Sequence, residues 1–421
     1  MLAIKFASYH YNYQDLSKVF FAKINREIKG GFRLMIKLGV SLYPEQEKME
    51  DIDNYLALAS KYGFTKVFTS MFSVDGTKEE IIEYFKNFTS IAHKYGMVVS
   101  GDCNGMFIEK MGASEKDLSV FKEMGIDIIR MDFSFRDERD AILINNKEGI
   151  GIEMSTSFID VIEKAIANGA NPSNITTCHN FYPQRYSAPT LEAINKLNNY
   201  WKEKQIKCAI FISSQEKGTH GPWPVSDGLP TIEEHRNMPI ESQLKHCISL
   251  KNIDEVIIGN AYASEEEFKK IAEVMEKAFI NVPRNDAMGF MADLMPHGDI
   301  TRIPLKIKLD ENITDLEKEV LFKFPIHNDM GDCLNYMLRS RMTRFIYKKA
   351  SIPARKTEKK LYTRGDVVIV NDNLKHYGGE VQIVLKDMEV DGQRNLLGRI
   401  AEEEMILLDQ LGAGDIFTFM E

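Results

Sequence analysis

The chain has 421 residues, of which 44% are hydrophobic and 27% are charged, and its formal net charge is −9 at pH 7. This length exceeds that of one ordinary domain and accommodates an α/β barrel with a smaller partner domain. The excess of acidic residues gives no general attraction for nucleic acid or for an anionic membrane surface, so neither is an expected partner.

The first segment, residues 1–34, has no clear strand or helix period and stops at Gly30-Gly31. Lys29-Gly30-Gly31 can be encoded by AAA-GGA-GGU, a bacterial ribosome-binding sequence, and Met35 follows at a suitable distance for a start codon. We therefore expect Met35 to be the native start and residues 1–34 to be a translated leader. The alternative is a real but loosely attached N-terminal arm, as chain ends often are.

Cysteine usage and hydropathy point to the cytoplasm. Five cysteines are scattered along the chain without a C-x-x-C pair, which favours a reduced compartment. No apolar run approaches the roughly 20 residues that span a bilayer, and the N-terminus lacks the apolar core of a signal peptide. We therefore expect a cytoplasmic protein without a membrane partner.

From Met35 onward, a pattern of strand, polar turn and amphipathic helix repeats along the chain. Eight such units predict a closed parallel TIM-type barrel over residues 35–300, with ligand chemistry at the C-terminal strand ends. Capping boxes are expected at Thr77 and Ser264. The predicted strands are 36–42, 65–70, 97–102, 127–132, 151–153, 175–181, 207–213 and 255–259. The predicted helices include 48–62, 78–95, 114–124, 157–168, 189–203 and 265–279.

The alternation stops after Ile280, and a mixed segment with three prolines, 281–304, marks a domain junction. Beyond it the chain becomes rich in β-branched residues and turn signals. These features predict a compact β-barrel or sandwich domain over residues 301–421, which is within ordinary domain size. Its predicted strands are 305–309, 366–370, 380–385 and 416–419.

Polar side chains stand at the C-terminal ends of several predicted strands. Asp132 and Glu153 end strands four and five, while Glu45, Asp102 and His179-Asn180 end or follow strands one, three and six. Neighbouring parallel strands are about 4.8 Å apart, so Asp132 and Glu153 can face one bound group, as glycosidic chemistry requires. We predict this pair as the catalytic carboxylates and leave their two roles unassigned. The alternative for each acid is a rim salt bridge or a helix cap.

Two segments after strands six and seven are rich in groups that suit a sugar. The first, 178–185, combines aromatic rings with imidazole and amide groups for hydroxyls, although a buried structural role is the alternative for His179. The second, 213–237, is long and rich in Gly and Pro, which predicts an ordered lid. The substrate-binding candidates from these segments are His179, Asn180, Tyr182, Arg185, His235 and Arg236.

An anionic group on the substrate needs a local arginine in this acidic chain. Arg185 and Arg236 are the barrel candidates. Arg339 and Arg344 belong to a basic cluster that is a further candidate for binding the anion. The alternative interpretation of this cluster is a solvent-exposed face without a ligand. In a dimer this cluster could reach the barrel of the neighbouring chain, and a contact within one chain is equally allowed. The sequence therefore does not decide whether the protein forms a homo-oligomer.

Metal and cofactor motifs are missing from the sequence. There is no H-E-x-x-H, no cysteine cluster, no P-loop and no dinucleotide-binding G-x-G-x-x-G. We therefore expect no cofactor and no catalytic metal, although three rim carboxylates could hold Mg²⁺.

The chain resembles the bacterial 6-phospho-N-acetylmuramidase family in several long motifs that are spread over residues 35–421. The motifs are LGVSLYPE (38–45), CHNFYP (178–183), DGLPTIEEHR (227–236), IGNAYAS (258–264), RGDVVI (364–369) and GEVQI (379–383).

This resemblance implies a TIM-type barrel followed by a cyclophilin-like β domain. It also implies a cytoplasmic glycosidase that cleaves a 6-phosphorylated N-acetylmuramic acid disaccharide, a small-molecule substrate of peptidoglycan recycling. Three rim segments, 100–105, 133–135 and 154–155, depart from the family pattern. They leave another 6-phosphoglycoside, or a non-catalytic sugar-phosphate binding protein, as alternative functions.

Overall fold

The computed structural model describes residues 36–44, 48–71, 74–225, 227–284, 295–331, 334–347 and 350–421. Ile36–Glu421 forms one compact unit. The expected leader, residues 1–34, and the candidate Glu45 lie outside the described residues, so both stay predictions. In the described part of the chain, no helix has both the length and the apolar character needed to cross a bilayer.

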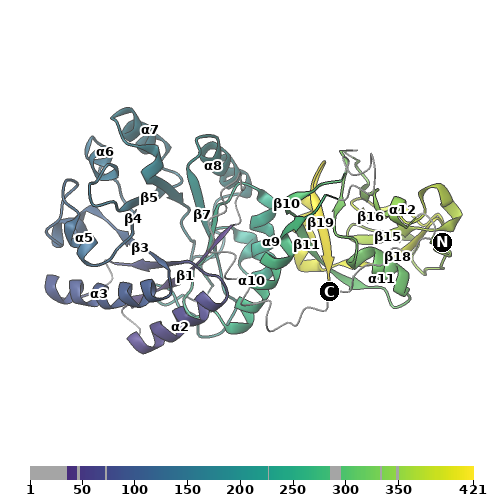
Figure 1. Cartoon of the computed structure of the whole chain (residues 1–421), viewed down its shortest axis with the longest axis horizontal. Helices are drawn as coiled ribbons and strands as arrows, with labels where there is room; N and C mark the ends of the chain where they lie inside the picture. The colour runs from purple at the N-terminus through teal and green to yellow at the C-terminus, as the bar shows by residue number, and fades with distance from the viewer. Residues whose placement is uncertain are drawn as a thin grey trace. The chain divides into compact units, whose positions relative to one another are not determined.

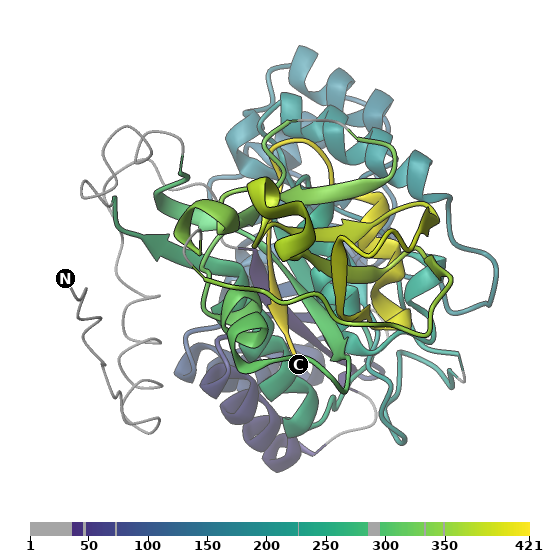
Figure 2. The same cartoon turned by 90° about the vertical axis from the view of Figure 1, so that its right-hand side faces the viewer.

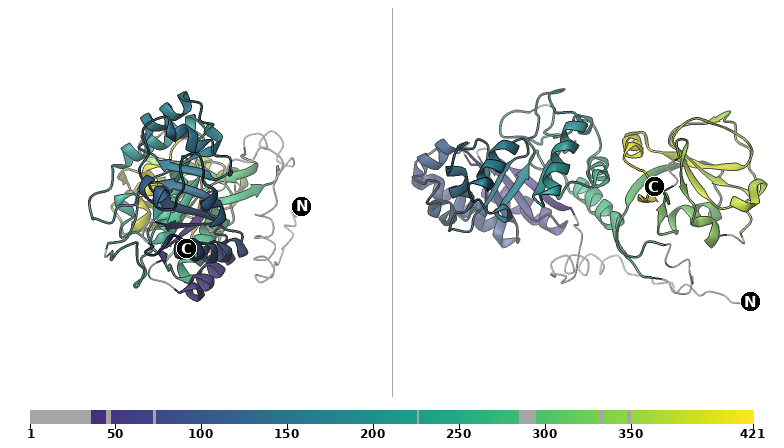
Figure 3. Two further views of the ribbon diagram at one scale, coloured as in Figure 1. Left: turned by 90° about the vertical axis from the view of Figure 1, so that its left-hand side faces the viewer. Right: turned by 90° about the horizontal axis from the view of Figure 1, so that it is seen from above.

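Eight parallel strands close into a barrel, because each strand pairs with the next and β8 pairs back with β1 (Figure 1). Helices surround these strands (Figure 3), which confirms the predicted TIM-type barrel and brings all C-terminal strand ends to one rim. The strands are β1 (Lys37–Leu42), β2 (Lys66–Ser70), β3 (Val98–Cys103), β4 (Ile128–Met131), β5 (Gly151–Ser155), β6 (Ile175–Cys178), β7 (Lys207–Ile212) and β8 (Glu255–Ile258). The helices are α2 (Met49–Lys61), α3 (Lys78–Lys94), α4 (Gly105–Lys110), α5 (Ser119–Glu123), α6 (Arg139–Ile144), α7 (Ile159–Ala167), α8 (Leu191–Glu203), α9 (Ile240–Leu250) and α10 (Glu265–Ala278).

Helix α3 shows how the sequence pattern determines this packing. Thr77 accepts a hydrogen bond from the Glu80 backbone at 3.3 Å, and the Glu80 carboxylate accepts one from the Thr77 backbone at 2.8 Å. This capping box and the one formed by Ser264 with Glu267 are both confirmed. Apolar residues that recur every three or four positions make one buried face, which consists of Ile81, Phe85, Phe88 and Ala92.

The structure departs from the predicted boundaries where the rim is built. Strand β5 continues to Ser155, so Glu153 is its middle residue and not its last one. Strand β6 ends at Cys178, and α5 begins only at Ser119. The short helix α4 precedes α5 and is capped by the Asn104 side chain. A helix of six residues carries too few turns for a clear apolar period, so the sequence pattern did not reveal it.

The chain continues from the barrel into a hairpin of β9 (Phe279–Val282) and β10 (Gly298–Thr301), followed by a seven-stranded sheet that nearly closes (Figure 2). The sheet order is β12-β19-β11-β18-β15-β16-β13. This is the predicted β domain, while its closer likeness to cyclophilins stays a prediction. The strands are β11 (Ile303–Leu309), β12 (His327–Asn328), β13 (Met337–Ser340), β15 (Asp366–Val370), β16 (Val381–Val384), β18 (Arg394–Ile400) and β19 (Ile416–Met420), beside the pair β14 (Leu361–Tyr362) and β17 (Met388–Glu389) and the helices α11 (Asp315–Phe322) and α12 (Thr343–Ile346).

Helix α9 contacts both the barrel and the C-terminal sheet and is buried along almost its whole length. Its Lys245 forms an ion pair with Glu404, and both side chains are fully buried. Glu404 also accepts hydrogen bonds from the Ser242 hydroxyl at 3.1 Å and from the backbone N–H of Lys306 in β11 at 2.6 Å. One buried carboxylate therefore links the barrel to the sheet.

Candidate active site

The site is organised around Arg130, a residue of β4 that the sequence interpretation left inside a buried strand. The strand register pairs Arg130 with Asp102 of β3 on one side and with Glu153 of β5 on the other. Side chains alternate between the two faces of a strand, so residues paired in parallel register share a face. Three charged residues on neighbouring strands therefore share the inner face of the barrel.

The Arg130 guanidinium binds the polar groups of the rim. Its Nη1 donates to Asp102 Oδ1 at 2.7 Å and lies 3.7 Å from Asp132 Oδ1. Its Nη2 donates to the Asn180 side-chain oxygen. Asp132 follows β4 directly, and its backbone N–H donates to the Cys103 carbonyl at 2.9 Å. One guanidinium thus brings Asp102, Asp132 and Asn180 together, as the rim prediction requires for these three residues.

The two aspartates lie in different environments. The Asp102 side chain is 13% exposed and the Asp132 side chain is 35% exposed. Burial raises the pKa of Asp102, with the nearby carboxylates of Asp132 and Glu153 adding to the effect and Arg130 opposing it. A carboxyl group whose pKa is raised by burial therefore stands beside a more exposed carboxylate.

Glu153 lies deeper in the barrel than the rim. The residue is 1% exposed. Its Oε2 accepts a hydrogen bond from Lys66 Nζ at 2.7 Å, and its Oε1 lies 3.4 Å from the Ser100 hydroxyl. Lys66, the first residue of β2, also donates to Glu255 of β8 at 2.7 Å. Glu153 is therefore part of a buried charge column, and Lys66, like Arg130, was missed in the sequence.

His179 is buried in a polar network behind the rim. Its Nδ1 is 3.0 Å from the Thr156 hydroxyl and its Nε2 is 2.6 Å from Asn198 Oδ1. Burial lowers the pKa of His179 to about 4, so the ring is neutral near pH 7. Both ring nitrogens have protein partners. These contacts fit the alternative interpretation of His179 as a buried structural residue.

The segment after β7 is held against the barrel by hydrogen bonds. Thr231 donates from its backbone to the Phe211 carbonyl at 3.0 Å, and the Tyr182 backbone donates to the Pro230 carbonyl at 2.9 Å. A Cβ at Gly259 would lie only 2.7 Å from the Leu229 carbonyl oxygen, so glycine permits this close approach. The predicted lid is thus packed onto β7 and β8 at these points.

Two further candidates serve this packing. His235 is fully buried, and its Nε2 is 2.8 Å from His246 Nδ1. Arg236 is 4% exposed and binds the Glu233 carboxylate at 2.6 and 2.8 Å. It also donates to the Asp227 carbonyl at 2.9 Å. These contacts hold the loop after β7 together and bind it to α9.

A polar cavity of about 340 Å³ opens at the C-terminal ends of β7 and β8. Three cationic side chains line it, from Arg185, Lys217 and Arg236. Arg185 donates to Asp227 at 2.7 Å and is 38% exposed. Loops after strands 7 and 8 are the usual phosphate-binding place in TIM barrels. Glu216 and Asp227 line the same cavity, so an anionic group would bind there among charges of both signs.

The structure places Arg339 and Arg344 in the C-terminal sheet region, on β13 and α12. The Arg339 guanidinium binds Glu380 at 2.6 and 2.9 Å, and Arg344 lies 3.4 Å from the same carboxylate. Glu380 is fully buried. Both arginines therefore contact the same buried carboxylate, which is a structural role. Their predicted contact with a substrate anion stays a prediction.

Among the described residues, no group of three or more His, Cys, Asp or Glu is arranged to hold a metal ion.

Comparisons with known proteins cover nearly the whole chain. Residues 38–273 match the family model "6-phospho-N-acetylmuramidase, N-terminal", and residues 303–420 match "6-phospho-N-acetylmuramidase, C-terminal". No curated protein matched the chain.

Two solved structures share the full architecture. An uncharacterised Bacillus cereus protein has 36% sequence identity and a TM-score of 0.79, over 92% of this chain and 100% of that one. A conserved Enterococcus faecalis protein of unknown function has 23% identity and a TM-score of 0.65, over 91% and 96% of the two chains. The second likeness supports the fold alone.

Proposed function

The chain belongs to the 6-phospho-N-acetylmuramidase family, and from this premise we propose that it hydrolyses a disaccharide of 6-phosphorylated N-acetylmuramic acid. The observation that carries the proposal is the pair Asp102 and Asp132 on either side of Arg130 at the rim. Hydrolysis of a glycosidic bond uses two carboxyl groups whose environments separate their protonation states.

The environments of the two carboxyl groups suggest their roles. Asp102 is the general acid, because burial favours its neutral form and a protonated carboxyl can donate to the leaving oxygen. Asp132 is the nucleophile or base, because it is more exposed and its negative charge lies near Arg130. Glu153 holds Lys66 below them. The pair Asp132 and Glu153, expected from the sequence, is the alternative assignment.

The separation of the carboxylates favours retention of the anomeric configuration. Asp102 Oδ1 and Asp132 Oδ1 lie 2.7 and 3.7 Å from the same nitrogen, so they are at most about 6.4 Å apart, the sum of these distances. Retaining enzymes have carboxyl groups about 5–5.5 Å apart, and inverting enzymes need about 6.5–9.5 Å for an intervening water. Asp132 therefore acts as a nucleophile in this proposal.

Two neighbouring features support binding of a phosphorylated sugar. The cavity lined by Arg185, Lys217 and Arg236 offers cationic groups for the 6-phosphate. Phe133 directly follows Asp132 and is 68% exposed, so its ring provides an apolar face for the sugar next to the reacting bond. A phosphorylated sugar is charged and does not cross a bilayer freely, which supports a cytoplasmic role in peptidoglycan recycling.

The test is release of 6-phospho-N-acetylmuramic acid from its β-glycoside by the wild type and by Asp102→Asn, Asp132→Asn and Glu153→Gln. We expect the two aspartate variants to lose at least about 10²- to 10⁴-fold in kcat, as acid and nucleophile roles require. An NMR time course should show the β-anomer of the product first. The control is Asp160→Asn, an exposed acid on α7, which should keep wild-type rates.

Other outcomes distinguish the alternatives. Full activity in Asp102→Asn with loss in Glu153→Gln, at unchanged stability, would assign the second role to Glu153. Tight binding of the phospho-sugar by the wild type without any product would support a binding protein instead of an enzyme.

A further inference from the structure

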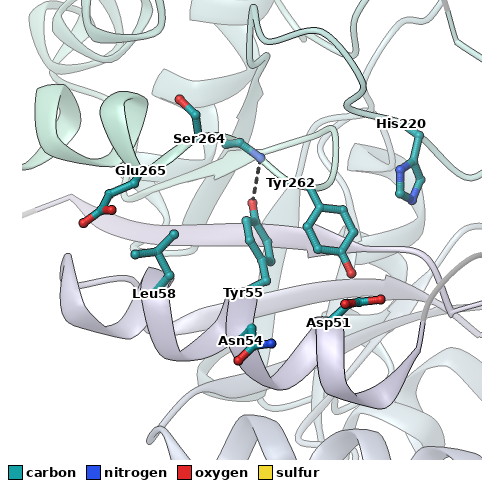
Figure 4. Close-up of a pocket in the computed structure, with 9 residues that line it drawn as sticks. Asp51, Asn54, Tyr55, Leu58, His220, Tyr262, Ser264 and Glu265 are labelled. Atoms are coloured by element: carbon teal, nitrogen blue, oxygen red, sulfur yellow. Dashed lines mark hydrogen bonds between the residues drawn. The ribbon is translucent and has the colours of Figure 1, made fainter.

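A second and larger cavity, of about 560 Å³, lies beside the barrel mouth between α2 and the segment that follows β8 (Figure 4). We call it the tyrosine groove. The mechanism proposed above does not use it. Its lining residues come from α2 (Asp51, Asn54, Tyr55 and Leu58), from the segment after β8 (Tyr262, Ala263, Ser264 and Glu265), and from His220.

Aromatic rings form the wall of the tyrosine groove. The rings of Tyr55 and Tyr262 lie side by side with centroids 4.8 Å apart, and the His220 ring is 5.7 Å from Tyr262 (Figure 4). Tyr262 has a left-handed backbone, with φ at 65°. Residues other than glycine rarely adopt this conformation, and such strain is concentrated at functional sites.

The walls of the groove are held by hydrogen bonds between the contributing segments. The Ala263 backbone N–H donates to the Tyr55 hydroxyl at 3.2 Å, and the Ala261 backbone N–H donates to the His220 carbonyl at 2.8 Å. These contacts fix α2, the segment after β8 and the loop after β7 to one another. The groove is therefore a formed surface that needs little rearrangement to bind a ligand.

The polar groups of the groove select against an anionic ligand. Asp51 and Asn54 are three residues apart on α2, so their side chains lie on the same face. Glu265 is balanced by Lys61 at 2.9 Å and also accepts from the Tyr62 hydroxyl at 2.7 Å. Asp51 then adds a carboxylate to a groove without a cationic lining residue. A flat ligand with hydroxyl groups and no negative charge fits this lining.

The groove adjoins the cationic cavity, because His220 lines both. His220 thus joins a cavity lined by three cations and by the carboxylates of Glu216 and Asp227 to a groove lined by tyrosines and carboxylates. We propose that the tyrosine groove binds the unphosphorylated sugar ring of an oligosaccharide whose phosphorylated ring is held in the mouth. This inference rests on the proposed function for the link to hydrolysis, whereas sugar binding by the groove does not depend on it.

The test uses Tyr262→Gly, which removes the ring while glycine accepts the left-handed backbone without strain. The matched control is Tyr186→Gly, because Tyr186 has φ at 64° but is 83% exposed and lies outside the groove. We expect N-acetylglucosamine to bind the wild type and Tyr186→Gly in an NMR titration, with at least about tenfold weaker binding to Tyr262→Gly, as loss of one aromatic contact predicts.

Kinetics provide the second readout. The ratio of kcat/KM for the disaccharide to kcat/KM for a small aryl 6-phosphoglycoside should fall about tenfold in Tyr262→Gly and in Asp51→Ala, and it should not change in Tyr186→Gly. An unchanged ratio together with unchanged sugar titration in Tyr262→Gly would overturn the inference. If the wild type hydrolyses neither glycoside but loses sugar binding in Tyr262→Gly, the groove assignment stands and the proposed function fails.

Discussion

At the scale of single residues, burial and the distance to Arg130 distinguish the two rim acids, Asp102 and Asp132. Arg130 donates to Asp102 at 2.7 Å while Asp132 stays at 3.7 Å, so the two carboxylates experience the same cation at different distances and different burial. The net effect on Asp102 is a pKa above its ordinary value, with burial as the largest cause. The proposed general acid, Asp102, therefore differs from Asp132 in its environment and not in its residue type.

This difference predicts a pH dependence and a leaving-group dependence. Because Asp102 has to be protonated to act as the acid, kcat/KM should fall as the pH rises through its raised pKa, and Asp102→Asn should lack this alkaline limb. An aryl 6-phosphoglycoside with an acidic phenol needs no proton on departure, so Asp102→Asn should retain most of its kcat/KM on it and show a burst of phenol release, because only the later attack of water needs Asp102 as a base. Asp132→Asn should lose kcat/KM on the same substrate. Equal losses of both variants on the aryl substrate would contradict the assignment.

The sequence could predict the acids of the site better than the cations. Asp102, Asp132 and Asn180 stand at or just beyond strand ends, where a barrel rim is expected, and the structure brings them together. Arg130 and Lys66 lie within segments that read as buried strands. Their hydrogen-bonded carboxylates lie 28 to 189 positions away in the chain, and no local pattern reveals such long-range partners.

At the scale of elements, strands β2, β5 and β8 are connected inside the barrel by the column Glu255–Lys66–Glu153. Lys66 is 3% exposed. Burial lowers its pKa, but the carboxylates of Glu153 and Glu255 more than offset this, and the net pKa lies above the ordinary value. The lysine is therefore charged in the folded barrel, and its stabilising effect is fully present below its unfolded pKa of about 10.4.

The column predicts a large effect of Lys66→Met on stability. Removal of the cation leaves two carboxylates without their partner, one of them fully enclosed, which should cost about 3–5 kcal/mol in urea unfolding. Glu153→Gln combined with Lys66→Met should cost less than the sum of the single changes. Lys207→Met is the matched control, because Lys207 also begins a barrel strand but is exposed. A loss below 1 kcal/mol in Lys66→Met would show that the column is not stabilising.

Helices and strands with a clear apolar repeat lie where the sequence predicts them. Strand β15 was predicted at 366–370, as found, and α3 was correct within one residue at its C-terminal end. The strands β13 and β18 and the helix α11 were not predicted. Each is defined by pairing or packing with distant segments, for example β18 with both β11 and β15, and such pairing leaves a weak local pattern.

At the scale of the whole described unit, barrel and C-terminal sheet share buried polar contacts through α9. Glu404 binds Lys245 and Ser242 of that helix and the backbone of β11. An ion pair without solvent exposure is costly to break from one side, because the remaining charge stays buried without compensation. The two parts should therefore unfold together in the wild type, even though each has its own sheet.

Lys245→Met tests this coupling, because it removes the cation and leaves Glu404 enclosed. We expect a loss of about 3–5 kcal/mol and, beyond that, separation of two transitions in urea. Both tryptophans of the chain, Trp201 and Trp223, belong to the barrel part, so fluorescence reports barrel unfolding while far-UV circular dichroism reports both parts. In the wild type the two signals should coincide; in Lys245→Met they should diverge.

The control is Lys270→Met, whose ion pair with Glu241 is long and partly exposed. Coincident transitions in Lys245→Met at wild-type urea midpoint would mean that α9 holds the parts together through its apolar contacts alone.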